Sequence, residues 1–263
     1  MKHKLLFIIL LVIQTSFAQD TITIYYNQNW KEIKSIDKAC YYRKFFGSND
    51  NYIANDYYMN GNLQMIGNYK TKKGDFREGY FKYFFENGKI KSEGDYVKDK
   101  QNGKWRNYLE NGEFDCEGEF LNGKKNGEWI WFSENGKICA KENYKKDKRI
   151  DYIFLEEKGN SVDILEAEHP ATFEGGNENN FSKWILNNIS YPKEAKGSTG
   201  TVLIEFNVNT KGIIENIKIV EHINEFLDNK AIKTVKSAPA WIPAKQHNKE
   251  INLLFKIPIP FKY

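Results

Sequence analysis

The chain has 263 residues, with 39 Lys and Arg against 35 Asp and Glu, which gives a net charge of +4. This length suffices for two domains, and so small a net charge does not favour a nucleic-acid-binding protein. Aromatic residues make up 15% of the chain, a content that favours sheet because aromatic side chains suit a pleated, half-buried surface.

The N-terminus has the pattern of an export signal. Lys2 and Lys4 precede an apolar run over residues 5–13, and the small residue Ala18 offers a cleavage point. We therefore expect residues 1–18 to be a signal peptide. The run is shorter than the ~20 apolar residues of a membrane span, so anchoring by an uncleaved segment is the minority alternative.

An internal repeat organises residues 57–150. The dipeptide Asn-Gly recurs after aromatic residues at Asn60-Gly61, Asn87-Gly88, Asn111-Gly112 and Asn135-Gly136, and the last three of these glycines are evenly spaced by 24 residues. A second glycine series at positions 79, 103 and 127 has the same step and introduces aromatic residues. Because Asn-Gly adopts the positive φ angles of a type I′ turn, each unit is expected to be a β-hairpin. Stacked hairpins would then form one elongated antiparallel sheet.

The rhythm of aromatic residues around these Asn-Gly turns, over about residues 57–144, resembles the MORN-variant repeat. The resemblance implies a scaffold or interaction surface, with residues 19–56 as a lead-in segment. We expect most of the aromatic side chains to pack the sheet.

Three cysteines in an exported chain leave at least one of them unpaired. Cys116 and Cys139 occupy positions offset by one residue in homologous strands, which predicts opposite faces of the sheet and no bridge between them. We expect them and Cys40 to be buried or half-buried thiols. The sequence shows no Cys/His cluster with the spacing of metal ligands, so no metal site is expected.

Residues 151–175 are expected to form a connector and residues 176–263 an α+β domain of two layers. Apolar stripes over 181–189 and 227–238 predict two amphipathic helices. Alternation over 202–208, a turn into 213–221, and a second alternating run over 251–261 predict a three-stranded antiparallel sheet.

The last strand carries an asymmetric pattern. Pro258 and Pro260 lack an N–H group and share one parity, so the edge to which their backbones point should be unpaired. Asn252, Leu254 and Lys256 would present N–H and C=O groups on that same edge. Such an edge accepts an extended peptide as an added strand, and prolines and lysine also protect free edges against aggregation.

The motifs of this domain resemble, in order and spacing, the C-terminal domain of TonB, a periplasmic protein that grips outer-membrane transporters. The matching residues, most of them architectural, are Tyr191, Pro192, Gly200, Gly212, Leu227, Asp228, Ala231, Pro239, Trp241 and Pro243. The resemblance implies peptide capture along the last strand. Lys196 occupies the position where the family commonly has Gln near the transporter contact. The resemblance to TonB also implies that the protein is located in the periplasm of a Gram-negative bacterium.

We therefore predict a non-enzymatic protein that binds an extended peptide of an outer-membrane transporter or other envelope partner, in TonB-dependent transport or envelope assembly. The histidines are scattered, and no nucleophile or phosphate-binding motif is recognisable. No cofactor, nucleic acid or small-molecule substrate is expected. Two alternatives stay open: a membrane-retained energy transducer that would engage an inner-membrane proton-driven complex, and a MORN-repeat scaffold or immunity-type protein.

Overall fold

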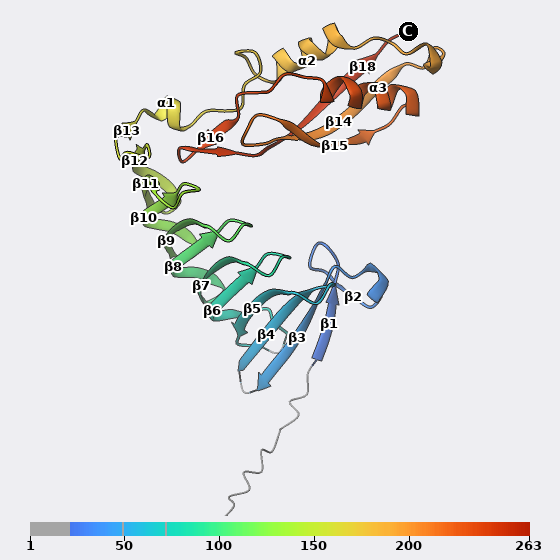
Figure 1. The fold of residues 1–263 in the computed structure, drawn as a ribbon. Helices are drawn as coiled ribbons and strands as arrows, with labels where there is room; N and C mark the ends of the chain where they lie inside the picture. Colours follow the sequence, from blue (N-terminus) through green and yellow to red (C-terminus); the bar gives the residue numbers. More distant parts are fainter. Residues whose placement is uncertain (1–21, 49, 72) are drawn as a thin grey trace, which may run out of the picture. The chain divides into compact units, whose positions relative to one another are not determined.

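The computed structural model describes residues 22–48, 50–71 and 73–263 (Figure 1). The expected signal peptide lies outside these residues. Among the described residues, no helix has the length and apolarity required to cross a membrane. The chain divides into two compact units, Met1–Gly112 and Glu113–Tyr263.

The N-terminal unit is an antiparallel array of hairpins. Its strands lie in the order β8-β7-β6-β5-β4-β3-β1-β2. Their bounds are β1 Ile22–Tyr26, β2 Glu32–Ile33, β3 Tyr41–Ser48, β4 Asn51–Tyr58, β5 Leu63–Tyr69, β6 Arg77–Phe84, β7 Ile90–Val97 and β8 Lys100–Tyr108, with a short 3-10 helix at Ile36–Lys38.

The C-terminal unit begins with further hairpin strands in the order β9-β10-β11-β12-β13. They are β9 Phe114–Leu121, β10 Lys124–Phe132, β11 Ile138–Lys145, β12 Lys148–Leu155 and β13 Ser161–Val162. The predicted antiparallel hairpin array is therefore confirmed. Its strands extend past residue 150, and the short helix α1, Ile164–Ala167, follows them.

The Asn-Gly turns at residues 60–61, 87–88, 111–112 and 135–136 are not of the expected type I′. In these turns only the glycine has a positive φ, for example +91° at Gly61 and +76° at Gly136. The Gly136 N–H donates to the Ser133 carbonyl at 2.8 Å, which is a type I turn followed by a left-handed residue, the three-residue hairpin class. Paired positive φ angles, the mark of type I′, occur instead in the alternate turns, at Lys98-Asp99, Asn122-Gly123 and Lys146-Asp147.

The asparagines of these turns join successive hairpins. Each Asn oxygen accepts from the N–H two residues on, as at Asn135, whose Oδ1 accepts from Lys137 at 3.1 Å. The amide nitrogen of the same side chain then donates to the next hairpin, at 2.7 Å to Glu157 Oε1. Asn87 repeats both contacts, to the Lys89 N–H and to the Glu110 carbonyl. The repeated Asn side chains therefore link the tips of neighbouring hairpins.

A third glycine series lets the aromatic rings approach the sheet. A Cβ built at Gly118 would lie 2.2 Å from the Trp129 ring, and one at Gly94 would lie 2.4 Å from Trp105. The ring of Trp129 covers the backbone of its neighbouring strand, and its indole N–H donates to the Glu119 carbonyl at 3.1 Å. These close contacts require glycine, because any larger residue would displace the ring.

The rest of the C-terminal unit is a two-layer α+β domain, as predicted. Its elements are α2 Glu178–Asn188, a 3-10 helix at Lys193–Ala195, β14 Gly200–Val208, β15 Ile214–Glu221, α3 Glu225–Lys236, β16 Ala244–Gln246, β17 Lys249–Ile251 and β18 Leu253–Phe261. The strands β15, β14 and β18 form an antiparallel sheet in that order. Helix α2 packs on β18, and α3 packs on β14 and β15 (Figure 1).

The alternation of the strands fixes which side chains enter the core. Val202, Ile204 and Phe206 of β14 are fully buried, and Ile257, Ile259 and Phe261 of β18 are at most 4% exposed. These residues meet the helices, as the alternation predicts. The pattern missed the short 3-10 helix at Lys193–Ala195 and the hairpin β16–β17, which occupies residues expected to belong to a loop and to the start of the last strand.

The three cysteines are free thiols. Cys116 and Cys139 are buried beside Trp129 and Trp131 in one apolar cluster, so the prediction that they lie on opposite faces of the sheet is wrong. The register shift between β10 and β11 leaves Cys139 as the extra residue of a bulge between Ile138 and Ala140, which offsets the one-residue difference in position. Cys40 is exposed, and the expectation of a buried or half-buried thiol is wrong there, since it lies just before β3 in a surface loop.

Candidate functional site

Strand β18 forms one edge of the three-stranded sheet. It pairs with β14 over nine consecutive residue pairs without a register shift, from Gly200–Phe261 to Val208–Leu253. Pro258 lies opposite Leu203, and Pro260 lies opposite Thr201. Because a proline cannot donate to a ladder, these are the pairs whose backbone groups point away from β14. Residues of the same parity therefore direct their backbone groups outward.

The outward groups differ along β18. Leu254 and Lys256 offer both an N–H and a C=O, whereas Pro258 and Pro260 offer a C=O alone. The Leu254 side chain is 58% exposed. Lys256 Nζ lies 3.1 Å from Glu205 Oε2 on β14. From Leu254 to Pro260 the edge measures about 20 Å, at ~3.4 Å per residue.

The opposite edge of the sheet is irregular. The pairing of β14 with β15 shifts register twice, between Leu203 and Ile204 and between Glu205 and Asn207. Asn216 of β15 has a φ of +53°. Bulges of this kind bend a strand and obstruct the pairing of a further strand. Of the two edges of this sheet, β18 is the straight one.

Two of the residues expected at the peptide-binding edge lie elsewhere. Asn252 is outside β18, between β17 and β18, and its Oδ1 accepts from the Thr210 N–H at 3.0 Å. Lys196 ends the 3-10 helix with a φ of +46°. It precedes Gly200, which pairs with Phe261, so Lys196 belongs to the opposite end of β18 from Leu254. The structure therefore leaves Leu254 and Lys256 together on the edge.

The remaining motif residues shape the fold around this edge. Tyr191 donates its hydroxyl to the Ser198 carbonyl at 2.9 Å, and Pro192 begins the 3-10 helix. A Cβ at Gly212 would lie 1.9 Å from the Trp241 carbonyl oxygen, and the Trp241 N–H donates to the Gly212 carbonyl at 2.8 Å. Trp241 itself is 3% exposed, so this contact holds the Trp in the core.

The second helix supplies the other motif residues. Leu227 and Ala231 are fully buried on α3. Asp228 accepts at the start of that helix, from the Ile223 N–H at 3.3 Å and from His222 at 3.0 Å. Pro239 and Pro243 lie in the segment between α3 and β16, where a proline cannot continue the helix.

An apolar cavity of about 330 Å³ lies at the Phe261 end of β18. Its lining comes from the end of α2, the segment after it, and the end of β18: Leu186, Ile189, Tyr191, Pro260, Phe261 and Lys262. Leu186 is 52% exposed. The pattern of the sequence had not singled out Leu186 or Lys262.

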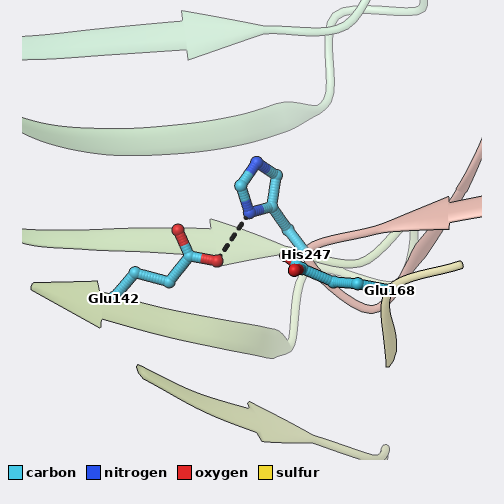
Figure 2. A group of neighbouring side chains, drawn as sticks. All are labelled: Glu142, Glu168 and His247. Carbon is cyan, nitrogen blue, oxygen red and sulfur yellow. Dashed lines mark hydrogen bonds and ion pairs between the residues drawn. The ribbon is translucent and has the colours of Figure 1, made fainter. Parts of the chain in front are cut away.

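A second cluster, the ionic cluster, joins the hairpin β16–β17 to the array strands of the same unit. His247, at the tip of that hairpin, donates from Nδ1 to Glu142 Oε1 at 2.7 Å (Figure 2). Its ring stacks on Trp131 with centroids 4.0 Å apart. Arg149 bonds Glu142 at 2.9 Å and both oxygens of Glu168 at 2.6 and 2.8 Å. Sequence spacing had treated His247 as an isolated histidine.

In the ionic cluster, the two carboxylates of Glu142 and Glu168 share the guanidinium group of Arg149. Ligand-type atoms of Glu142, Glu168 and His247 lie within 4.8 Å of one another, but the Arg149 guanidinium already bridges the two carboxylates where a metal ion would lie. Burial alone would raise the pKa of Glu142. The hydrogen bonds from His247, Tyr144 and Arg149, with the charge interaction with His247, outweigh burial and lower that pKa.

Two more contacts secure the hairpin β16–β17. Asn248 donates from its backbone N–H to the Ala167 carbonyl at 3.1 Å and from its amide to the Leu155 carbonyl at 2.9 Å. Lys249 bonds the carboxylate of Asp115. His247 and Asn248 have φ angles of +55° and +56°, the type I′ geometry of a two-residue hairpin. Within the C-terminal unit, the α+β domain is therefore docked on the strands β9, β11 and β12 through this turn and the lysine after it.

The N-terminal unit has a cleft of about 580 Å³ around the buried residue Arg43. Arg43 forms a bidentate pair with Asp56 at 2.6 and 2.7 Å and bonds the Tyr69 hydroxyl at 3.2 Å. Burial raises the pKa of Tyr69 to about 12. Arg77, also in the lining, is paired with Asp99 at 2.6 Å. Both guanidinium groups are thus neutralised within the cleft.

The described residues define a class of protein in which an antiparallel hairpin array precedes a two-layer α+β domain. The family of the Gram-negative bacterial TonB protein C-terminal domain matches residues 187–263. The MORN repeat variant matches residues 77–98 and 125–146. The chain therefore belongs to the TonB C-terminal domain family and carries MORN-variant repeats ahead of that domain.

Two solved structures are similar to this chain, both NMR structures of the Helicobacter pylori TonB C-terminal domain. One is 31% identical, with 31% of this chain and 75% of that chain covered and a TM-score of 0.26. The other is 30% identical, with 32% of this chain and 91% of that chain covered and a TM-score of 0.28. A search of curated proteins found no match.

Proposed function

We propose that this protein is an exported TonB-like binding protein of the Gram-negative envelope, without catalytic activity. It captures an extended segment of an outer-membrane transporter or another envelope protein as an added strand on β18. The observation that carries the proposal is the straight outer edge of β18, where Leu254 and Lys256 direct main-chain donors and acceptors away from β14. Main-chain hydrogen bonds supply affinity in strand addition.

The differences along the edge indicate where the segment binds most tightly. Beside Leu254 and Lys256 the segment both donates and accepts hydrogen bonds. Beside Pro258 and Pro260 it only donates, because the prolines offer no N–H. The prolines also limit pairing between copies of this chain. The Leu254 end of the edge can therefore both donate and accept hydrogen bonds, whereas the proline end can only accept them.

Membership of the TonB family supports this partner class, and the N-terminal segment supports export. Mass spectrometry of the protein purified from cells tests the location. A mature N-terminus at Gln19 is expected after cleavage of a signal peptide. An intact Met1 in the inner-membrane fraction would contradict export and favour a retained energy transducer.

Capture from an envelope extract tests the edge itself. In Leu254→Pro the outward N–H is removed, whereas the ladder to β14 keeps its hydrogen bonds. One main-chain hydrogen bond contributes about 0.5–1.5 kcal/mol, so binding is expected to weaken about two- to twelvefold. Leu254→Ala is the matched control, since it trims the side chain and keeps the N–H. Pro258→Ala restores a donor and is expected to strengthen binding.

All three variants must have the circular dichroism spectrum of the wild type for the comparison to hold. Capture of TonB-dependent transporters by the wild type and its loss in Leu254→Pro would support strand addition. Equal capture by wild type, Leu254→Pro and Pro258→Ala would exclude the β18 edge as the site. In that case the hairpin array would be the binding surface.

A further inference from the structure

The apolar cavity at the Phe261 end of β18 has no role in the fold described so far. Its walls are Leu186, Ile189 and Tyr191 on one side and Pro260 and Phe261 on the other. Leu186 is half exposed on α2, at 52%. An exposed leucine at the mouth of an apolar cavity is a feature of binding surfaces, where a ligand or partner removes the leucine from solvent.

The position of α2 relates this cavity to an added strand. Helix α2 packs on β18, the outer strand, whereas α3 packs on β14 and β15. A strand added to β18 would lie about 4.8 Å beyond it, next to the helix that borders the cavity. Alternate side chains of that strand would face the helix layer, on the same side as Ile259 and Phe261.

The prolines make a side-chain contact necessary at this end. Beside Pro258 and Pro260 the edge offers only carbonyl oxygens, so an added strand gains fewer main-chain hydrogen bonds there than beside Leu254. Affinity at this end must come from burial of a side chain, and the cavity lies against Pro260.

We propose that the captured segment anchors one large apolar side chain in the cavity formed by Leu186, Ile189, Tyr191, Pro260 and Phe261. This inference rests on the proposed strand addition and specifies the partner's chemistry. The partner carries an extended stretch with a Leu-, Ile-, Met- or Phe-sized residue about five or seven residues from the position that pairs beside Leu254. The separation follows because a side chain that faces the helix layer belongs to a residue opposite Ile259 or Phe261, and not to one opposite Pro260.

Site-specific photocrosslinking in cells identifies the segment. A photoreactive side chain is placed at Leu254 on the edge, at Leu186 on α2, or at Phe226, which is 51% exposed on α3 and is the matched control. Mass spectrometry then locates the crosslinked residues in the partner. We expect Leu254 and Leu186 to capture the same segment about five or seven residues apart, with an apolar residue at the Leu186 site, and Phe226 to capture none of it.

The captured segment, synthesised as a peptide, is then titrated against full-length protein. Leu186→Asp is expected to weaken binding about ten- to hundredfold, as the loss of one buried apolar side chain implies. Phe226→Asp is expected to leave binding unchanged. Replacement of the apolar residue by Ala in the peptide should weaken binding to the wild type by a similar factor and have little further effect on Leu186→Asp.

Each outcome separates this inference from the proposed function. Capture at Leu254 with wild-type affinity in Leu186→Asp would overturn the anchor and keep strand addition. Capture at neither Leu254 nor Leu186 would overturn both. Equal losses in Leu186→Asp and Phe226→Asp would also overturn the anchor, because a nonspecific effect of added negative charge would then explain the result.

Discussion

Replacement of Gly118 by alanine tests how the aromatic rings pack on the hairpin array. The new Cβ would lie 2.2 Å from the Trp129 ring, whereas ordinary contacts begin at 3.4 Å, so ring or strand must move by about 1.2 Å (3.4 − 2.2). Trp129 is only 2% exposed, and the dense packing of a protein interior leaves little room for its indole to shift.

The cost has two parts. Overpacking of a dense core costs about 1–3 kcal/mol. Displacement of the ring also strains the hydrogen bond from its indole N–H to the Glu119 carbonyl, at 3.1 Å, which contributes about 0.5–1.5 kcal/mol. We therefore expect Gly118→Ala to lower the free energy of unfolding by about 2–4 kcal/mol.

Gly136→Ala is the matched control. Gly136 has a φ of +76°, and a Cβ there meets nothing within 4 Å, so the substitution costs only the left-handed backbone strain of about 1–2 kcal/mol. Urea unfolding followed by tryptophan fluorescence and circular dichroism measures both. A loss in Gly118→Ala no larger than in Gly136→Ala would refute the packing argument. Trp129→Leu should recover part of the loss in Gly118→Ala, because the smaller side chain admits the methyl group.

Three further predictions concern titratable groups. Glu142→Gln should lower the free energy of unfolding at pH 7 by about 1.5–3 kcal/mol, because it removes the buried carboxylate charge that accepts hydrogen bonds from Arg149 and Tyr144. Since the folded state lowers the pKa of Glu142, the wild-type advantage should be full above about pH 4.5 and decline as the pH falls further, and an advantage independent of pH would contradict this. Burial raises the pKa of the Cys139 thiol to about 11, so iodoacetamide at pH 8 should alkylate exposed Cys40 within minutes and Cys139 only after unfolding. With its pKa raised to about 12 by burial, Tyr69 should favour the folded state below pH 10 and lose that contribution as the pH rises further, and an absorbance titration of Tyr69→Phe against wild type should show one tyrosine missing from the late phase.

Much of the architecture followed from periodicity. Alternation in residues 202–208 and 257–261 identified the buried faces of β14 and β18, because successive side chains in a strand point to opposite sides. The parity of Pro258 and Pro260 identified the outer edge of the sheet before the strand order was known. The even spacing of the Asn-Gly dipeptides likewise placed the hairpin tips at residues 87–88, 111–112 and 135–136. These rules depend on residues close together in the chain, so the strands and turns that they govern can be predicted from the sequence.

Contacts between distant segments could not be predicted from such local sequence patterns. Asn-Gly was compatible with two turn classes, and the glycine bulges of the array selected the one with a single positive φ. His247 gave no signal, because its partner Glu142 lies 105 residues away. The cavity beside Pro260 combines residues of α2 and β18 that no local pattern links. Chain geometry sets strands and turns locally, whereas docking surfaces and cavities depend on which side chains the completed fold brings together.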